Sequence, residues 1–174
     1  MRWEEVAADL ADSWESEQVA ETEGEIAERL VAERARIRLV DRLAAAVGRD
    51  VGMRVTGADW ARGTVVDVGP DWCLLRGADS VESLIALAGV SQVTGLGEGA
   101  RDPDLESTVA ARYGLAAVLR RLVDGGEVTL ALVDGTRLRG RITSVGADTL
   151  DLQRGSDPEL LCCPTGNLAL LSWR

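Results

Sequence analysis

Apolar and polar residues alternate along two stretches of this chain, and a period of two predicts β-strands. The alternation begins over residues 51–55 in the first stretch and over residues 128–132 in the second. Glycine, proline and aspartate interrupt both stretches at short intervals, as turns require. We expect five short strands in each stretch, over residues 51–55, 63–68, 72–75, 84–87 and 90–96, and over residues 128–132, 138–142, 150–152, 160–163 and 168–173.

The two stretches are copies of one another. Residues 48–76 align with residues 125–153 at a constant offset and without a gap. The identical pairs are Gly48/Gly125, Val51/Val128, Arg62/Arg139, Gly63/Gly140, Val68/Val145, Gly69/Gly146, Asp71/Asp148 and Leu75/Leu152. Apolar residues are also exchanged for one another at matching positions, such as Met53 and Leu130. This pattern indicates one small folding unit that has been duplicated.

A helical period precedes each stretch. Apolar residues recur at helical spacing over residues 2–23 and again over residues 25–47, where Gly48 suits the end of a helix. A third helix is expected to begin after Asp104 or Ser107 and to end before Gly125. Between the two copies, residues 97–107 have no apolar period and contain glycine and proline, so we interpret them as a linker.

Negative charge is concentrated at the N-terminus. The net charge of the 174 residues is −10, and residues 1–28 contain ten acidic residues and one arginine. The other 146 residues hold 19 acidic residues and 18 arginines and are therefore almost neutral. We describe the chain as an acidic helical arm (1–36) attached to a nearly neutral body, and we refer to residues 1–36 as the acidic arm.

The composition removes several kinds of chemistry. The chain has no histidine and no lysine, so it lacks the usual general base and the lysine of phosphate-binding loops and Schiff bases. Cys73, Cys162 and Cys163 lie in apolar, strand-like sequence without metal-ligand spacing, and we interpret them as reduced thiols. No residues form a nucleophile–base constellation. We therefore expect a protein that is not an enzyme, with no cofactor and no metal ion.

The spacing of the second copy resembles the Sm-like family of SH3-type barrels. The resemblance rests on Asp134-Gly135, on the mid-strand Gly140, and on the apolar residues that follow them, ending at Asp148, Leu150 and Leu152. It implies an α+β, mainly β protein with two Sm-like five-stranded antiparallel barrels, each preceded by a helix. The expected domains are the acidic arm, a first barrel (37–96), a linker (97–107) and a second barrel (108–174). The chain also resembles uncharacterised actinobacterial proteins that begin with a similar Met-Arg-Trp-Glu segment, a likeness that implies no activity.

Sm-like proteins usually form rings and bind RNA in the central pore, and this chain departs from their RNA-binding pattern. Ala88-Gly89 and Thr165-Gly166 stand where the family has an Arg-Gly motif between its last two strands. Arg76-Gly77 and Arg154-Gly155 occur earlier, after the third strand, and do not correspond to that motif. The resemblance therefore implies the fold without the RNA site.

Two groups of residues are candidate binding surfaces. The first is a stripe of apolar residues on the acidic arm, namely Trp3, Val6, Leu10 and Trp14. Tryptophan side chains often anchor interfaces, so the stripe suits a docking element. It also suits packing on the chain's own barrel or on a second copy, and we prefer this second interpretation. The second group is a candidate anion or RNA face formed by Arg120, Arg121, Arg137, Arg139 and Arg141. We prefer to interpret these arginines as a solvated strand face.

These observations favour a non-enzymatic, cytoplasmic interaction or scaffold module. We expect it to act through association of barrel edges, as a homo-oligomer, and to engage a protein partner through its acidic helix. The alternative is an RNA-binding regulator that uses the arginine face in an assembled ring. The longest apolar run is shorter than the ~18 residues of a membrane-spanning helix and the N-terminus has no signal-peptide pattern, so we expect no membrane association.

Overall fold

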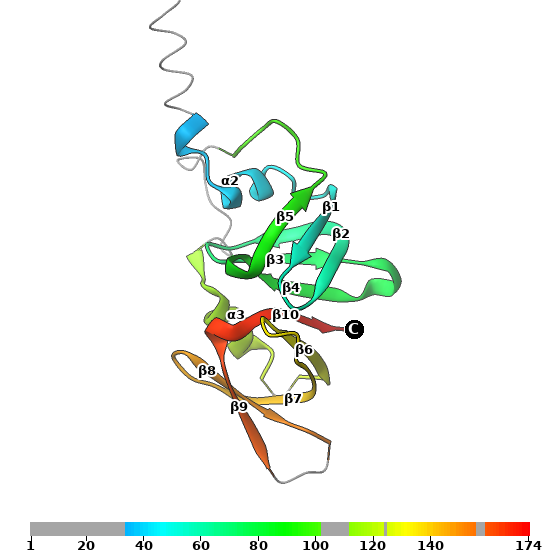
Figure 1. Cartoon of the computed structure of the whole chain (residues 1–174), viewed down its shortest axis with the longest axis vertical. Helices are drawn as coiled ribbons and strands as arrows, with labels where there is room; N and C mark the ends of the chain where they lie inside the picture. The colour runs from blue at the N-terminus through cyan, green and yellow to red at the C-terminus, as the bar shows by residue number, and fades with distance from the viewer. Residues whose placement is uncertain (1–33, 102–111, 124, 156–158) are drawn as a thin grey trace, which may run out of the picture. The chain divides into compact units, whose positions relative to one another are not determined.

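Ten strands form, one at each of the ten predicted places, and they join in one antiparallel sheet (Figure 1). The computed structural model describes residues 34–101, 112–123, 125–155 and 159–174. The chain divides into two units, Met1–Arg38 and Leu39–Arg174, and all ten strands belong to the second. The strands are β1 (Asp50–Val55), β2 (Asp59–Val68), β3 (Trp72–Arg76), β4 (Glu82–Ala86), β5 (Val90–Thr94), β6 (Val128–Leu132), β7 (Arg137–Val145), β8 (Thr149–Gln153), β9 (Leu160–Pro164) and β10 (Leu168–Trp173).

The prediction of two separate five-stranded barrels, each preceded by a helix, is wrong. The strands form a single open sheet in the order β5-β1-β2-β3-β4-β10-β6-β7-β8-β9. Antiparallel pairing of β4 with β10 joins the two copies, with Leu84 opposite Leu171 and Ile85 opposite Leu170. These two strands carry apolar side chains on both faces, so each gains burial from both copies and a boundary between independent barrels does not form.

The two copies have the same strand order within the sheet. In the first, β1 to β4 follow in sequence and β5 lies beside β1; in the second, β6 to β9 follow in sequence and β10 lies beside β6. The second strand of each copy has a register shift at the same place, after Val65 in β2 and after Ile142 in β7. The two copies therefore share the position of this irregularity as well as the number of strands.

A glycine allows the second strand of each copy to approach the third strand closely. A Cβ atom at Gly63 would overlap the backbone carbonyl of Arg76, and one at Gly140 would overlap the carbonyl of Gln153. Glycine is thus required at both positions by the backbone of the neighbouring strand.

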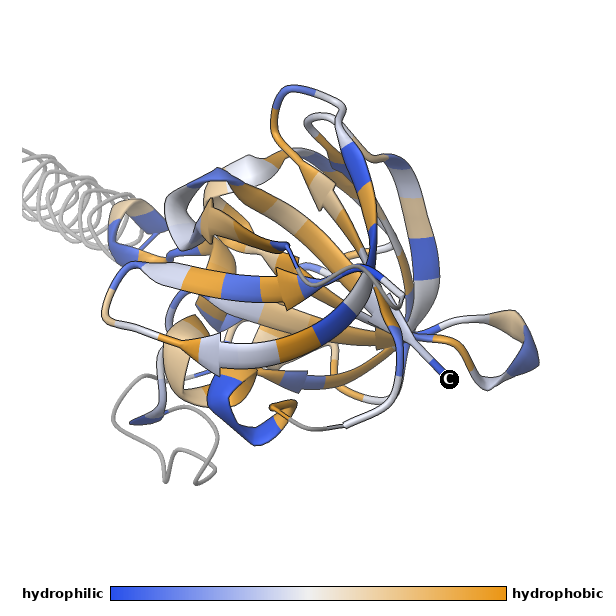
Figure 2. Cartoon of the chain, turned by 90° about the horizontal axis from the view of Figure 1, so that it is seen from below, coloured by the Kyte–Doolittle hydropathy of each residue, from blue (hydrophilic) through white to orange (hydrophobic). Residues whose placement is uncertain are grey.

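The sheet buries two hydrophobic cores, and β3 and β4 contribute to both of them. Cys73, Leu75 and Ile85 face the core of the first copy, together with residues such as Met53. The side chains that alternate with them, among them Leu84, face the core of the second copy. Other strands of the sheet alternate between hydrophobic and hydrophilic residues, as the bands in Figure 2 show.

The helices that the structure describes are short. They are the α-helices α2 (Leu39–Ala44) and α3 (Leu115–Arg121) and three single-turn 3-10 helices, η1 (Ala78–Ser80), η2 (Leu87–Gly89) and η4 (Thr165–Asn167). Residues 34–36 are helical as well. The chain leaves the helical conformation at Ile37 and Arg38, so the prediction of a continuous helix over residues 25–47 is wrong in its described part. Leu43 and Ala46 are buried against the first core, whereas Ile37 is 42 % exposed, and this segment buries too narrow an apolar stripe to hold one long helix on the sheet.

First-copy residues hold the start of α3. The backbone N–H of Leu115 donates a hydrogen bond of 2.8 Å to the Asp71 carboxylate, which caps the helix. The indole N–H of Trp72 donates a 2.8 Å hydrogen bond to the carbonyl of Tyr113. Trp72 is 3 % exposed and packs in the core of the second copy. The two copies are thus joined by polar contacts, by a shared core and by strand pairing.

The turn predicted at Asp134-Gly135 is confirmed. Gly135 has φ +89°, a left-handed conformation that glycine adopts without strain, and β6 and β7 pair on either side of it. The backbone N–H of Thr136 donates a 2.8 Å hydrogen bond to the Asp134 carboxylate. This bond lowers the pKa of Asp134 below its usual value.

Replacing Gly140 by alanine should destabilise the protein by about 1–3 kcal/mol, the usual range for overpacking, because the new methyl group would displace the β8 backbone. Urea denaturation would measure the loss. Gly166→Ala is the matched control, since a Cβ there meets no atom within 4 Å and should change the free energy of unfolding by less than ~1 kcal/mol. Equal effects of the two substitutions would contradict the close approach.

Candidate interaction site

The two end strands of the sheet, β5 and β9, offer unpaired backbone edges. Among the described residues, β5 pairs only with β1, and β9 pairs only with β8. An exposed strand edge presents N–H and C=O groups to which another strand can add. These two strands and their side chains therefore form the candidate interaction site.

The outward face of β9 is apolar and exposed. Along this strand Leu161 and Cys163 turn toward the core of the second copy, and Leu160, Cys162 and Pro164 alternate with them on the other face. All three outward residues are exposed, and Leu160 is 51 % exposed. We call Leu160, Cys162 and Pro164 the β9 row.

Two residues of the β9 row, Cys162 and Pro164, have buried counterparts in the first copy, whereas the counterpart of Leu160 is the partly exposed Glu82. In the first copy Trp72 lies opposite Ala86, and in the second Thr149 lies opposite Pro164. The same register relates Leu84 of β4 to Cys162 of β9. Leu84 is 0 % and Ala86 6 % exposed, because the second copy covers them.

The strand next to β9 adds acidic character to this surface. Asp151 of β8 lies opposite Cys162. Desolvation, followed by hydrogen bonding to Asp151, raises the pKa of the Cys162 thiol above its usual value. The hydroxyl of Ser144 donates a 2.5 Å hydrogen bond to the Asp151 carboxylate and holds it in place. The edge is therefore an apolar row beside a fixed carboxylate, with a thiol that is mainly protonated at neutral pH.

Buried thiols are inert in this fold. Cys73 lies in the first core with 0 % exposure, and burial, followed by the charge of Asp67, raises its pKa to about 12. Desolvation also raises the pKa of the buried Cys163. Cys162 is thus the cysteine that a reagent in solution can reach.

The candidate anion face is only partly assembled. Arg137, Arg139 and Arg141 are exposed at alternate positions of β7, as the sequence predicts. Arg139 forms a 2.7 Å ion pair with Glu127 in which both side chains are at least half exposed, a kind of pair that contributes little to stability. Its charge is nonetheless partly neutralised by that neighbour.

Arg120 lies elsewhere and acts on the backbone. Its guanidinium donates hydrogen bonds of 3.3 Å to the Val145 carbonyl and 2.6 Å to the Gly146 carbonyl, which tie α3 to the turn between β7 and β8. Arg121, the next residue, is exposed. The arginine row of β7 is therefore the part of the candidate face that stays on one surface.

The candidate docking residues of the acidic arm, Trp3, Val6, Leu10 and Trp14, lie outside the described residues. They remain a prediction from the sequence.

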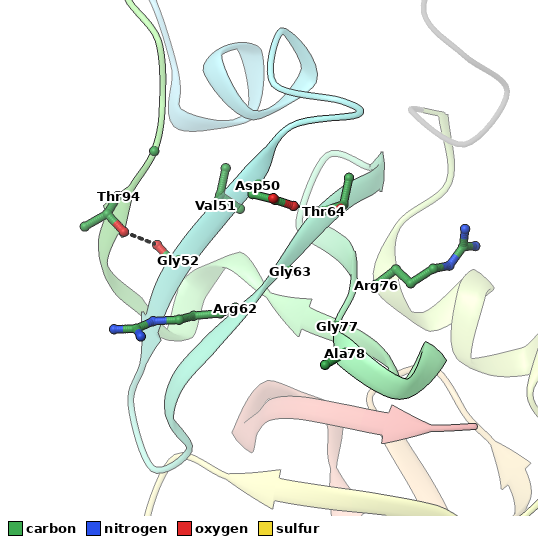
Figure 3. A pocket seen from close by; sticks show the side chains of 11 residues that line it. Asp50, Val51, Gly52, Arg62, Gly63, Thr64, Arg76, Gly77, Ala78 and Thr94 are labelled. Atoms are coloured by element: carbon green, nitrogen blue, oxygen red, sulfur yellow. Dashed lines mark hydrogen bonds between the residues drawn. The ribbon is translucent and has the colours of Figure 1, made fainter.

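A hollow of about 620 Å³ lies beside the end of β5 (Figure 3). Its polar groups already bond to one another: the Thr64 hydroxyl donates a 2.6 Å hydrogen bond to Asp50, and the Thr94 hydroxyl donates a 3.4 Å bond to the Gly52 carbonyl. Arg62 and Arg76 lie on different sides of the hollow and do not converge (Figure 3). The hollow therefore lacks the convergent polar groups that orient a small ligand.

The described residues contain no cluster of three or more histidine, cysteine, aspartate or glutamate side chains that could hold a metal ion. Asp67 and Asp71, which lie at the two sides of the turn between β2 and β3, instead support the backbone. Asp67 accepts a hydrogen bond from the N–H of Val68, and Asp71 caps α3. Over the same residues, the helices are too short and too polar to cross a lipid bilayer.

Comparisons with known protein families, with curated proteins and with solved structures gave no match to this chain. The resemblance to Sm-like proteins therefore stays a prediction from the sequence.

Sequence reasoning did not single out the β9 row. A signal was present, because residues 160–163 are apolar at four consecutive positions, as strands buried on both faces are. Only the sheet order reveals that this strand is at an end of the sheet, with one of its two faces uncovered.

Arg120→Ala should lower the free energy of unfolding by about 1 kcal/mol, because two charge-assisted hydrogen bonds to the backbone are lost. Arg121→Ala is the control, since it changes an exposed neighbour and should stay within about 0.5 kcal/mol of the original protein. Urea denaturation would measure the free energy of unfolding of both variants. If the two variants have the same stability, Arg120 does not hold α3 to the β7–β8 turn.

Proposed function

We propose that this chain is a non-enzymatic interaction module that binds a partner by strand addition at β9. The observation that carries the proposal is the β9 row, an exposed apolar strand face next to an unpaired backbone edge. Backbone hydrogen bonds along such an edge provide affinity, and the alternating side chains provide selectivity. The acidic arm would recruit or regulate the partner through its tryptophans.

The comparison with β4 supports this function. β4 is the equivalent strand of the first copy. It already pairs with β10 of the second copy, whose core covers Leu84 and Ala86. The fold therefore uses this kind of edge for strand addition once within the chain. Exposed apolar strand edges are otherwise avoided, because they promote aggregation.

We further propose that the module acts in the cytoplasm. Cys73, Cys162 and Cys163 are unbridged thiols, which suits a reducing compartment.

RNA binding through the arginine row of β7 is the second candidate. The exposure of Arg137, Arg139 and Arg141 on one strand favours it. The ion pair of Arg139 with Glu127 and the net charge of −10 weigh against it, since nearby carboxylates repel a polyanion.

Photocrosslinking in cells would test the module. A photoreactive phenylalanine analogue replaces Leu160 in the full chain, and the same analogue replaces Arg137 in a matched control on the arginine row. We expect protein adducts from position 160 and none from position 137, because only β9 offers an apolar edge. Absence of protein adducts from position 160 would overturn the proposed function, and RNA adducts from position 137 would favour the second candidate.

Binding of a labelled single-stranded RNA over a salt series provides an independent test. We expect no salt-dependent affinity and no change in the double variant Arg139→Ala/Arg141→Ala. If the logarithm of the affinity falls steeply with that of the salt concentration, and the double variant reduces this slope by about two, RNA binding replaces the proposal.

A further inference from the structure

The pairing of β4 with β10 provides a template for what can occupy β9. Within the chain, β4 of the first copy and β10 of the second pair antiparallel, with Leu84 opposite Leu171 and Ser83 opposite Ser172. The counterpart of β4 in the second copy is β9. The counterpart of β10 in the first copy is β5, because Met53 lies opposite Val93 as Leu130 lies opposite Leu171. The two end strands, β9 and β5, are therefore equivalent to the two strands that pair at the centre of the sheet, β4 and β10.

The side chains at these ends match that relation. Cys162 is exposed where Leu84 is 0 % exposed, and Val93 is partly exposed where Leu171 is 0 % exposed. A similar difference occurs at the helices. Leu39, the first residue of α2, is 37 % exposed, whereas Leu115, the first residue of α3, is 7 % exposed. At the centre of the sheet the two copies bury each other's apolar side chains. At the two ends of the sheet the equivalent side chains stay exposed to solvent.

We propose that copies of this chain associate head to tail, with β9 of one copy pairing antiparallel with β5 of the next in the register of β4 and β10. Cys162 then lies opposite Val93, and Leu161 lies opposite Thr94. Leu160 lies opposite Gly95, at the rim of the hollow that Figure 3 shows. This inference rests on the proposed function and names its partner.

Charge favours a second copy over the acidic arm as the occupant. Asp151 lies opposite Cys162, and the backbone of Asp148 bonds to Thr165 just after β9, so two acidic residues lie beside this edge. Residues 1–28 carry a net charge of −9 and would be repelled from this edge. β5 itself has no ionisable side chain, and its residues are Val90, Ser91, Gln92, Val93 and Thr94.

The contact is weaker than the one within the chain. Ser91 and Gln92 are exposed and polar, whereas their counterparts in β10 are Ala169 and Leu170. The association is therefore reversible and depends on protein concentration. Because the contact joins two different surfaces, each copy keeps one unused β5 and one unused β9, and assembly continues until a ring closes or a filament grows.

Disulfide trapping tests the register. Val93→Cys in the full chain places a second thiol opposite the native Cys162 at the ~4.5–5.5 Å Cα separation of antiparallel neighbours, which permits a disulfide. With copper phenanthroline and air as oxidant, we expect covalent dimers and larger species, with the bridge between position 93 and Cys162 identified by peptide mass mapping. Thr94→Cys is the matched control, because its side chain lies on the opposite face, and it should give few or none. No bridge from Val93→Cys, or equal bridging from Thr94→Cys, would overturn the proposal.

Sedimentation velocity over a concentration series tests the contact without covalent bonds. We expect the average mass to rise at least twofold above the 18.5 kDa of one chain. Cys162→Lys should hold the protein at the mass of one chain, because it would bury a charge in the contact, whereas Cys162→Ala should still associate. The same position is exposed in the single chain, so both variants should keep the circular dichroism and melting temperature of the original protein.

The outcomes separate this inference from the proposed function. A single-chain mass at all concentrations, or association that persists in Cys162→Lys, overturns head-to-tail pairing. If the adduct from position 160 is then a different protein, the interaction module stands and its partner is not a second copy. If position 160 yields no protein adduct, both fail.

Discussion

The pairing of β4 with β10 is the contact on which the rest of the sheet depends. Leu84 and Ile85 point to opposite faces of one strand, and each is buried in a different core. Neither copy can bury both faces of β4 alone, because a five-stranded unit covers only its inner side. Without the second copy, the outer row of β4 with Leu84 would lie in water, at a cost of about 1.5–3 kcal/mol for a leucine-sized side chain. The second copy removes that cost, and Asp71 and Trp72 fix its α3 in place.

The strands could be predicted from the sequence, whereas their arrangement in one sheet could not. Alternation at positions such as Val128 and Leu130 reports which residues of a strand face inward, and it does so locally. It does not report which strand lies alongside. The continuous apolar runs at 84–87 and 168–171 are a signal of burial on both faces, whereas their interpretation as ordinary short strands leads to two separate barrels. The prediction of one long helix over residues 25–47 is wrong for a similar reason. Helical spacing identifies an apolar stripe, but it does not show how much of that stripe the sheet can bury.

The candidate surfaces illustrate the same limit. The exposure of Arg137, Arg139 and Arg141 followed from strand geometry alone. The position of Arg120 did not, because its hydrogen bonds to Val145 and Gly146 depend on how α3 packs on β7. The β9 row required the sheet order, since an apolar strand at an end of the sheet and one at the centre have the same sequence pattern.

Duplication in a single chain has a thermodynamic consequence for two related contacts. The β4–β10 contact is intramolecular, so a high effective concentration keeps it closed however dilute the protein is. In the proposed head-to-tail pairing, the edges at β9 and β5 obey mass action instead. Fusion of the two units in one chain thus makes the β4–β10 contact permanent, whereas the β9–β5 contact depends on protein concentration. One pair of equivalent residues that differs between the copies agrees with this contrast. Trp72 anchors the permanent β4–β10 contact, whereas the smaller Thr149 lies next to the β9 edge.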